Sequence, residues 1–278
     1  MIKKYIKNKN ILLNVRVYSE TKSETIILLH GGPGIPDKMV EVVDILKNKF
    51  RIITFDQRGT GNSKCENCDF SIDSYISDIN IIIDFFSIKS FHLFGYSWGG
   101  LYAQIYASKN YKKILSLFLC SSMPGTSEIW KEAEKEAITF NKKSSNFITL
   151  LSIAFYSVLG IFGNSFAYKK LYEKILENYT KNENNLQYNY NIFANISAKA
   201  INKTRKNALK YTEIKGLQNP DFPIFITYGD NDIYTKTQKF VFNKYPTAKR
   251  QIIENSGHTA WLQNPEKFRE IITKFYDL

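Results

Sequence analysis

The stretch Phe91-His-Leu-Phe-Gly-Tyr-Ser-Trp-Gly-Gly100 contains the clearest structural signal in the chain. Its first four residues are apolar and typical of a strand, and a helix-compatible run begins at Leu101. Between them, Gly95-Tyr-Ser-Trp-Gly99 places a serine in a turn so sharp that the positions two residues away on either side must be small. The stretch therefore predicts a strand, a tight turn centred on Ser97, and a helix.

Strands and helices alternate on both sides of this stretch. Residues 25–29 and 51–55 are apolar runs of strand type, and residues 72–86 carry apolar side chains at the three-four spacing of an amphipathic helix. The alternation returns at residues 222–228 and ends in a predicted helix over residues 265–276. This order predicts an α/β fold whose mostly parallel sheet is flanked by helices.

The alternation stops after the Met-Pro-Gly sequence that ends at Gly125. From there to about Leu209 the chain shows only helical or loop patterns, with many Asn, Tyr and Lys residues. We therefore predict one α/β domain built from residues 1–125 and 210–278, interrupted by a helical insertion over residues 126–209.

Charge and composition narrow the classes of partner. The chain has 278 residues, with 38 Lys and Arg against 26 Asp and Glu, for a formal net charge of +12. The lysines are spread along the whole chain without a dense basic tract. We therefore expect a small-molecule or short-peptide substrate and no nucleic-acid partner. Residues 1–20 lack the apolar core and cleavage site of a signal peptide, so we expect a cytoplasmic protein.

The three cysteines, Cys65, Cys68 and Cys120, form an odd set and predict no disulfide framework. Cys65-Glu-Asn-Cys68 is a single Cys-x-x-Cys pair, and one such pair does not make a zinc site without two more ligands. We interpret it as a loop with incidental cysteines, with a redox or metal role as the alternative.

The turn around Ser97 resembles the nucleophile turn of the α/β-hydrolases. Serine is a poor nucleophile at neutral pH and needs a base to accept its proton. The chain has three histidines. His30 belongs to a glycine-rich loop and His92 lies inside a predicted strand, whereas His258 follows a strand in a polar loop. His258 is the predicted general base.

The acid of an α/β-hydrolase comes between the serine and the histidine in the chain, at the end of a strand. Gly229-Asp-Asn-Asp232 occupies that place and offers two carboxylates. We favour Asp232, because the extra residues beyond the strand let its side chain reach toward His258. Asp230 is the alternative.

The tetrahedral intermediate of acyl transfer carries an oxyanion, which needs two hydrogen-bond donors. The backbone N–H of Trp98, directly after the serine, is the predicted first donor. The second is expected from the loop His30-Gly-Gly-Pro-Gly34, where glycine lets the backbone approach a substrate closely. Gly32 is the favoured residue and Gly31 the alternative.

Three motifs together resemble the proline iminopeptidase branch of the α/β-hydrolases: His30-Gly-Gly-Pro-Gly34, Asp56-Gln-Arg-Gly-Thr-Gly-Asn-Ser63 and Gly95-Tyr-Ser-Trp-Gly-Gly100. The resemblance implies the α/β-hydrolase fold, with an eight-stranded, mostly parallel sheet and a helical cap over the active site. It also implies an acyl-serine intermediate, release of an N-terminal residue, and no metal or organic cofactor.

The insertion departs from that family, because no motif in it can be matched. The family uses acidic cap residues to hold the α-amine of the substrate. The candidates here are Glu128, Glu132, Glu134, Glu136, Glu173 and Glu177. Two alternatives therefore stay open: an esterase or thioesterase acting on an apolar acyl group, and a hydrolase-fold binding protein without catalysis.

Residues 147–163 form an uncharged apolar run between two lysine pairs. We favour a cap helix that packs on the catalytic domain and lines an apolar pocket. An interfacial element that contacts lipid and a membrane span are the alternatives, since 17 residues lie at the lower limit for a span.

Overall fold

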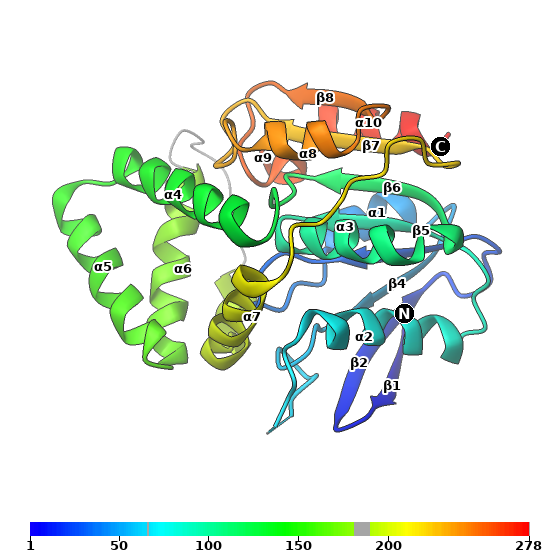
Figure 1. Cartoon of the computed structure of the whole chain (residues 1–278), viewed down its shortest axis with the longest axis horizontal. Coiled ribbons are helices and arrows are strands. Elements are labelled where there is room, and N and C mark those ends of the chain that lie inside the picture. The colour runs from blue at the N-terminus through cyan, green and yellow to red at the C-terminus, as the bar shows by residue number, and fades with distance from the viewer. Residues whose placement is uncertain (66, 181–189, 278) are drawn as a thin grey trace.

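The computed structural model describes residues 1–65, 67–180 and 190–277. Within these residues, eight strands form one sheet in the order β1-β2-β4-β3-β5-β6-β7-β8 (Figure 1). Strand β2 is antiparallel to β1 and β4, and every other pair of neighbours is parallel. The mostly parallel sheet predicted from the alternation of strands and helices, and the eight strands implied by the family resemblance, are thus confirmed. The strands are β1 (Ile2–Asn8), β2 (Ile11–Tyr18), β3 (Thr25–Leu29), β4 (Arg51–Phe55), β5 (Phe91–Tyr96), β6 (Ile114–Cys120), β7 (Ile224–Gly229) and β8 (Lys249–Ile253).

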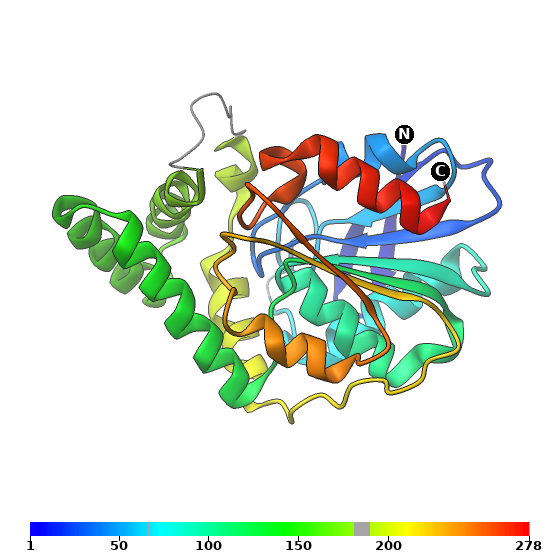
Figure 2. The ribbon, with the colours of Figure 1, turned by 90° about the horizontal axis from the view of Figure 1, so that it is seen from above.

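Helices cover both faces of the sheet (Figure 2). Every residue of β3 is buried, because Ile27 and Leu29 join the core under α2 and α3 while Ile26 and Leu28 join the core under α1 and α10. This explains the uniformly apolar run of that strand. The covering helices are α1 (Val40–Leu46), α2 (Ile72–Phe85), α3 (Trp98–Asn110), α8 (Gln238–Lys244), α9 (Ala260–Gln263) and α10 (Pro265–Tyr276).

The described part of the chain between β6 and β7 is mainly helical and lies to one side of the sheet (Figure 1). Residues 181–189 of the predicted insertion lie outside the described residues. The Ser197 N–H donates to the Gly34 carbonyl at 2.9 Å, which anchors the insertion on the glycine-rich loop. The described elements are α4 (Ser127–Ser144), α5 (Phe147–Ile161), α6 (Ser165–Thr180), the short 3-10 helix η2 (Tyr190–Asn195) and α7 (Ala198–Lys210).

Helix α5 differs from the sequence prediction in its packing. It lies against α6, with Ile153 and Tyr156 beside the buried Tyr168, and it is far from the sheet (Figure 1). Its 15 residues rise only about 22 Å, less than the thickness of a bilayer core, so the spanning alternative is wrong. In the described part of the chain, no helix is both long enough and apolar enough to cross a membrane.

Two local features are visible near the start of the sheet domain, and the first differs from the sequence analysis. Cys65 and Cys68 are paired in a disulfide in the loop before α2, although the cysteine count predicted no disulfide framework. Helix α1 begins at Val40, directly after Met39, whose left-handed backbone with φ 51° is not helical.

Candidate active site

Ser97 lies at the sharp turn between β5 and α3. Its backbone has φ 54° and ψ −120°, a combination that non-glycine residues rarely adopt. The turn presses α3 against the end of β3, so that a Cβ atom at Gly99 would overlap the carbonyl oxygen of Leu29. The requirement for small residues around the serine therefore comes from direct backbone contact.

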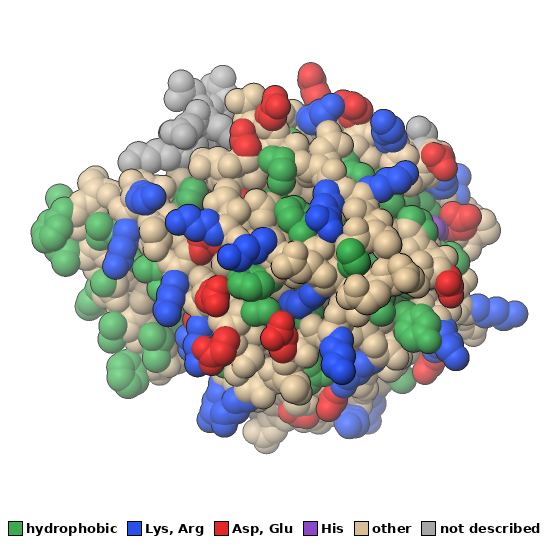
Figure 3. Space-filling view, turned by 45° about the horizontal axis from the view of Figure 1, so that its top comes forward, with side chains coloured by type: hydrophobic (Ala, Val, Ile, Leu, Met, Phe, Trp, Pro, Cys, Tyr) green, Lys and Arg blue, Asp and Glu red, His purple; other side chains and the backbone are tan. Residues whose placement is uncertain are grey.

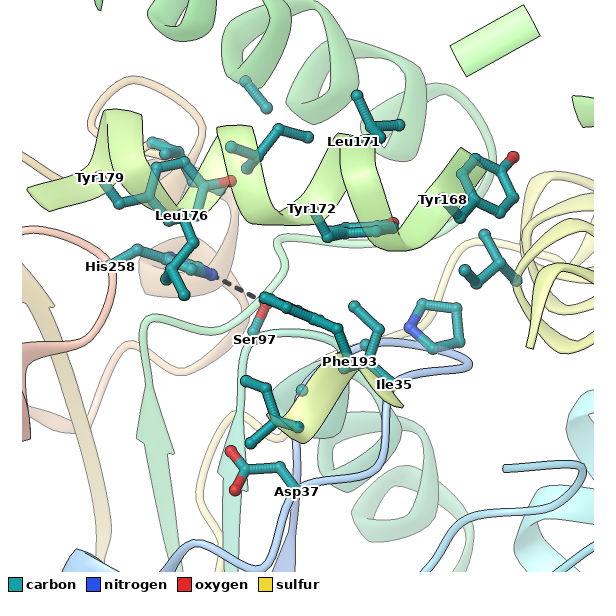
Figure 4. Close-up of a pocket in the computed structure, with 18 of the residues that line it drawn as sticks. Ile35, Asp37, Ser97, Tyr168, Leu171, Tyr172, Leu176, Tyr179, Phe193 and His258 are labelled. Atoms are coloured by element: carbon teal, nitrogen blue, oxygen red, sulfur yellow. Dashed lines mark hydrogen bonds between the residues drawn. The ribbon is translucent and has the colours of Figure 1, made fainter. Parts of the chain in front are cut away.

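Ser97, His258 and Asp232 come together from three separate loops. The Ser97 Oγ atom lies 2.9 Å from His258 Nε2 (Figure 4), and His258 Nδ1 lies 3.0 Å from Asp232 Oδ1. All three residues are buried. They follow β5, β8 and β7, and parallel strands place their carboxyl ends at the same edge of a sheet. The geometry is that of a nucleophile, a base and an orienting carboxylate.

Asp230 has a different position from Asp232. Its carboxylate accepts hydrogen bonds from the backbone N–H groups of Asn255 and Ser256, at 3.0 and 3.1 Å. It therefore holds the turn that leads to His258, whereas Asp232 contacts the imidazole itself.

Of the two residues predicted as oxyanion donors, Trp98 directly follows Ser97 in the chain, and Gly32 belongs to the glycine-rich loop that approaches Ser97 through Gly31. Trp98 is the first residue of α3, where a helix presents unpaired N–H groups. Gly32 has φ 117°, which a residue with a side chain would adopt only under strain. Its neighbour Gly31 is close to the serine, since a Cβ atom at Gly31 would lie 3.3 Å from the Ser97 Cβ.

Gln57 connects the three motifs, and sequence reasoning missed it. Its Nε2 group donates to the His30 carbonyl at 2.8 Å, and its Oε1 atom accepts from the Trp98 indole Nε1–H at 2.8 Å. The glycine-rich loop, the Asp56–Ser63 loop and the serine turn are thus held together by one buried side chain. The Asp56-Gln-Arg-Gly motif signals an unusual loop but not the partners of its glutamine.

Asp56 and Arg58 brace this loop through buried ion pairs. Asp56 pairs with Arg16, and Arg58 pairs with Asp78 at 2.7 Å. Burial acts to raise the pKa of Asp56, but the Arg16 guanidinium and the hydrogen bonds from Asn62 and Asn14 outweigh it, so the pKa lies below its usual value. These charged groups contact one another and not the Ser97 side chain.

The other two histidines have structural contacts. His30 Nδ1 lies 2.7 Å from the Gly31 carbonyl, and burial lowers the pKa of its imidazole. His92 Nδ1 lies 2.8 Å from Ser116 Oγ between neighbouring strands. In the described residues, no three His, Cys, Asp or Glu side chains gather into an arrangement that could hold a metal ion.

Three tyrosine rings surround the imidazole of His258. The ring centroids of Tyr96, Tyr179 and Tyr234 lie 5.2, 5.5 and 5.4 Å from that of His258. They come from β5, from α6 in the insertion and from the loop after β7. No local pattern marks these tyrosines, because only the tertiary fold brings them to one place.

Ser97 and His258 line a cavity of about 1580 Å³ between the sheet edge and the insertion. Helix α6 forms one wall, and Phe193 stacks against Tyr172 of this helix with 6.2 Å between the ring centroids (Figure 4). Ile35 also lines the cavity. The cavity is larger than a typical site for a small ligand, and its wall is mainly aromatic and aliphatic. The residues that α6 contributes are Tyr168, Leu171, Tyr172, Ile175, Leu176 and Tyr179.

Only Glu134, among the six glutamates predicted to bind an amine, lines this cavity. Its carboxylate is already engaged by the Arg205 guanidinium, with Nε at 2.5 Å and Nη2 at 2.6 Å, and by the Trp130 indole N–H at 2.7 Å. Glu136 instead accepts hydrogen bonds from the Thr237 N–H and hydroxyl, which ties α4 to the loop after β7.

A family model described as alpha/beta hydrolase fold matches residues 24–265. A proline iminopeptidase of Lactobacillus delbrueckii subsp. lactis is 25% identical over 296 residues, which cover 97% of this chain and 96% of the relative. This relative confirms the resemblance stated from the motifs.

Solved structures are also similar over nearly the whole chain. A proline iminopeptidase of Mycobacterium smegmatis has a TM-score of 0.67 at 18% identity, covering 99% of this chain and 97% of that one. A Bacillus megaterium epoxide hydrolase has a TM-score of 0.73 at 15% identity, covering 99% and 100%. At such identities the structures show the fold, and together with the family match they establish that the chain belongs to the α/β-hydrolase fold family.

Proposed function

We propose that this hydrolase cleaves an acyl bond through an acyl-serine intermediate. The supporting observation is the chain of contacts from Ser97 Oγ to His258 Nε2 and from His258 Nδ1 to Asp232, at 2.9 and 3.0 Å. In this proposal Ser97 attacks the substrate carbonyl while His258 accepts its proton, and Asp232 stabilises the imidazolium. The N–H groups of Trp98 and Gly32 stabilise the oxyanion.

The first tetrahedral intermediate collapses as His258 donates its proton to the departing amine, alcohol or thiol, which leaves the acyl-serine. In the second half of the reaction, a water molecule attacks the acyl-serine while His258 accepts a proton again. Collapse of the second intermediate returns the proton to Ser97 and releases the acid.

Our first proposal for the activity is that of an aminopeptidase, which releases the N-terminal residue of a peptide substrate. Its support is the similarity, over almost the full length, to a protein named proline iminopeptidase. A second proposal is an ester or thioester with an apolar acyl group. It is supported by the apolar cavity wall and by Glu134, whose carboxylate is engaged by Arg205 rather than open to an amine.

Two measurements test these proposals. A fluorophosphonate probe should label the wild type and not Ser97→Ala, and an unlabelled wild type would favour a non-catalytic binding protein. A panel of prolyl amides and acyl esters of increasing chain length then separates the substrates. If the protein cleaves the esters but none of the prolyl amides, the aminopeptidase proposal is ruled out.

A further inference from the structure

Helix α5 presents a broad apolar face to solvent. Seven of its large side chains, including Phe162 just after its end, have between 53% and 85% of their surface exposed. Their spacing of three and four residues places them along one side of the helix. Single exposed apolar residues are common, but a contiguous patch of this kind marks an interaction surface. We call these residues the α5 face: Phe147, Ile148, Leu151, Phe155, Val158, Ile161 and Phe162.

The charged residues nearest the α5 face in the sequence are lysines. From residue 138 to residue 172 the sequence contains four lysines and no aspartate or glutamate. Lys142 and Lys143 are exposed at the end of α4, shortly before α5 begins. Lys169 and Lys170, which follow α5, both pair with Glu173. We therefore take Lys142 and Lys143 as the basic border of the face. Figure 3 shows hydrophobic side chains gathered at the end of the molecule where α5 lies, with lysine or arginine side chains beside them. An apolar face with a basic border complements an anionic lipid surface.

The α5 face is continuous with the cavity that contains Ser97. Phe147, Leu151 and Ile161 belong to the face and also line the cavity. The exposed Ile138 on α4 lines it as well. An apolar molecule held in a bilayer beneath this face therefore has a path into the cavity that avoids water. This continuity distinguishes a lipid surface from a second protein, which would cover the entrance.

We propose that α5 lies in the plane of a bilayer containing anionic lipid, with the α5 face in the interfacial region and the cavity opening toward the lipid. At about 22 Å, the helix is too short to span and suited to lying flat. Hydrophobic burial of the α5 face provides adhesion, and Lys142 and Lys143 add attraction to anionic headgroups.

Co-sedimentation with vesicles tests the proposal. The Ser97→Ala protein is mixed with vesicles of phosphatidylcholine alone or with added phosphatidylglycerol, so that binding is measured whether or not the chain has the proposed activity. We expect binding to the anionic vesicles that weakens with salt. Phe155→Ser/Phe162→Ser and Lys142→Glu/Lys143→Glu should each weaken it by at least about tenfold.

Matched controls lie far from α5 on the sheet domain. Phe85→Ser removes a similarly exposed aromatic ring, and Lys112→Glu/Lys113→Glu reverses a similarly exposed lysine pair. Both should bind like the parent protein, and circular dichroism should show that all variants are folded. Equal binding by Phe155→Ser/Phe162→Ser and the parent would overturn the proposal. A second outcome would also overturn the proposal: the parent protein does not bind vesicles and forms a dimer in sedimentation velocity, and the double variant is monomeric. The α5 face would then join two copies of the chain.

Discussion

Ser97 combines an unfavourable backbone with close contacts to His258. A non-glycine residue with φ 54° costs about 1–3 kcal/mol and persists only where the surroundings enforce it. Here the backbone contact at Gly99 and the packing of α3 on β3 enforce it. The consequence is that the hydroxyl is held toward the cavity and within hydrogen-bond distance of the imidazole.

Substitutions at Ser97 and Asp232 should separate their proposed roles. Ser97→Ala should lower kcat for an acyl ester by about 10⁶-fold. Asp232→Asn should lower it by about 10⁴-fold, because the amide no longer stabilises the imidazolium. Asp230→Asn serves as the matched control, since its carboxylate contacts only backbone N–H groups, and it should change kcat by less than about tenfold. A larger loss for Asp230→Asn than for Asp232→Asn would assign the acid to Asp230.

Lys244 should make stability depend on pH. Its ammonium group is buried beside the Pro124 carbonyl, and burial lowers its pKa from 10.5 to about 8. Between these values the unfolded chain binds a proton that the folded chain does not, so the free energy of unfolding rises with pH. Relative to Lys244→Met, the free energy of unfolding of the wild type should increase by about 3 kcal/mol between pH 8 and 10.5. Urea unfolding at several pH values measures this difference. A difference between the two proteins that stays constant over this range would contradict the prediction.

At the scale of elements, α7 is joined to α2 by one buried hydrogen bond. The hydroxyl groups of Tyr75 and Thr204 lie 2.7 Å apart, and both residues are almost fully buried. Helix α7 also contacts the glycine-rich loop, because the Ser197 N–H donates to the Gly34 carbonyl. Helix α7 therefore contributes specific contacts to the position of the insertion over Ser97.

Thr204→Val should destabilise the protein by about 1–3 kcal/mol, because it leaves the Tyr75 hydroxyl buried without its partner. The double variant Tyr75→Phe/Thr204→Val removes both polar groups and should recover most of this loss. Thermal and urea unfolding of the four proteins measure the coupling. If the double variant is as unstable as the sum of the two single variants, the hydrogen bond does not join these helices.

At the scale of the whole molecule, the sheet domain and the insertion build one site. The ring of Tyr179, from α6, contacts His258, and its carbonyl accepts from Gln263 Nε2 at 3.0 Å. The general base proposed here is thus packed between two parts of the chain that are distant in sequence.

Tyr179→Leu should therefore reduce kcat/KM by about fivefold, since it removes a ring contact worth about 1 kcal/mol that positions His258. Tyr179→Phe keeps the ring and should stay within about twofold of the wild type. The two variants are compared on the same ester. Equal activity of Tyr179→Leu and the wild type would show that the insertion does not position His258.

Much of the α/β framework could be predicted from the sequence because its signals are local. Uniformly apolar runs such as Thr25–Leu29 belong to strands buried on both faces. The candidate residues Ser97, Asp232 and His258 could be selected because each follows a predicted strand, and parallel strands bring their ends together. The preference for Asp232 over Asp230 depends on which carboxylate can extend to His258, and this is a matter of distance in space. In the structure Asp232 contacts the imidazole, whereas Asp230 accepts from a backbone N–H group.

By itself the sequence determined the sheet, the serine turn and the set of candidate residues. Strand composition and glycine spacing are properties of short segments, and the three histidines are counted directly from the sequence. Only the tertiary structure decided the character of the cavity. Glu134 is engaged by Arg205 from a helix about seventy residues later, and α5 turns one side toward α6 and the other toward solvent. Such pairings depend on how helices pack across long separations, which helical periodicity does not specify.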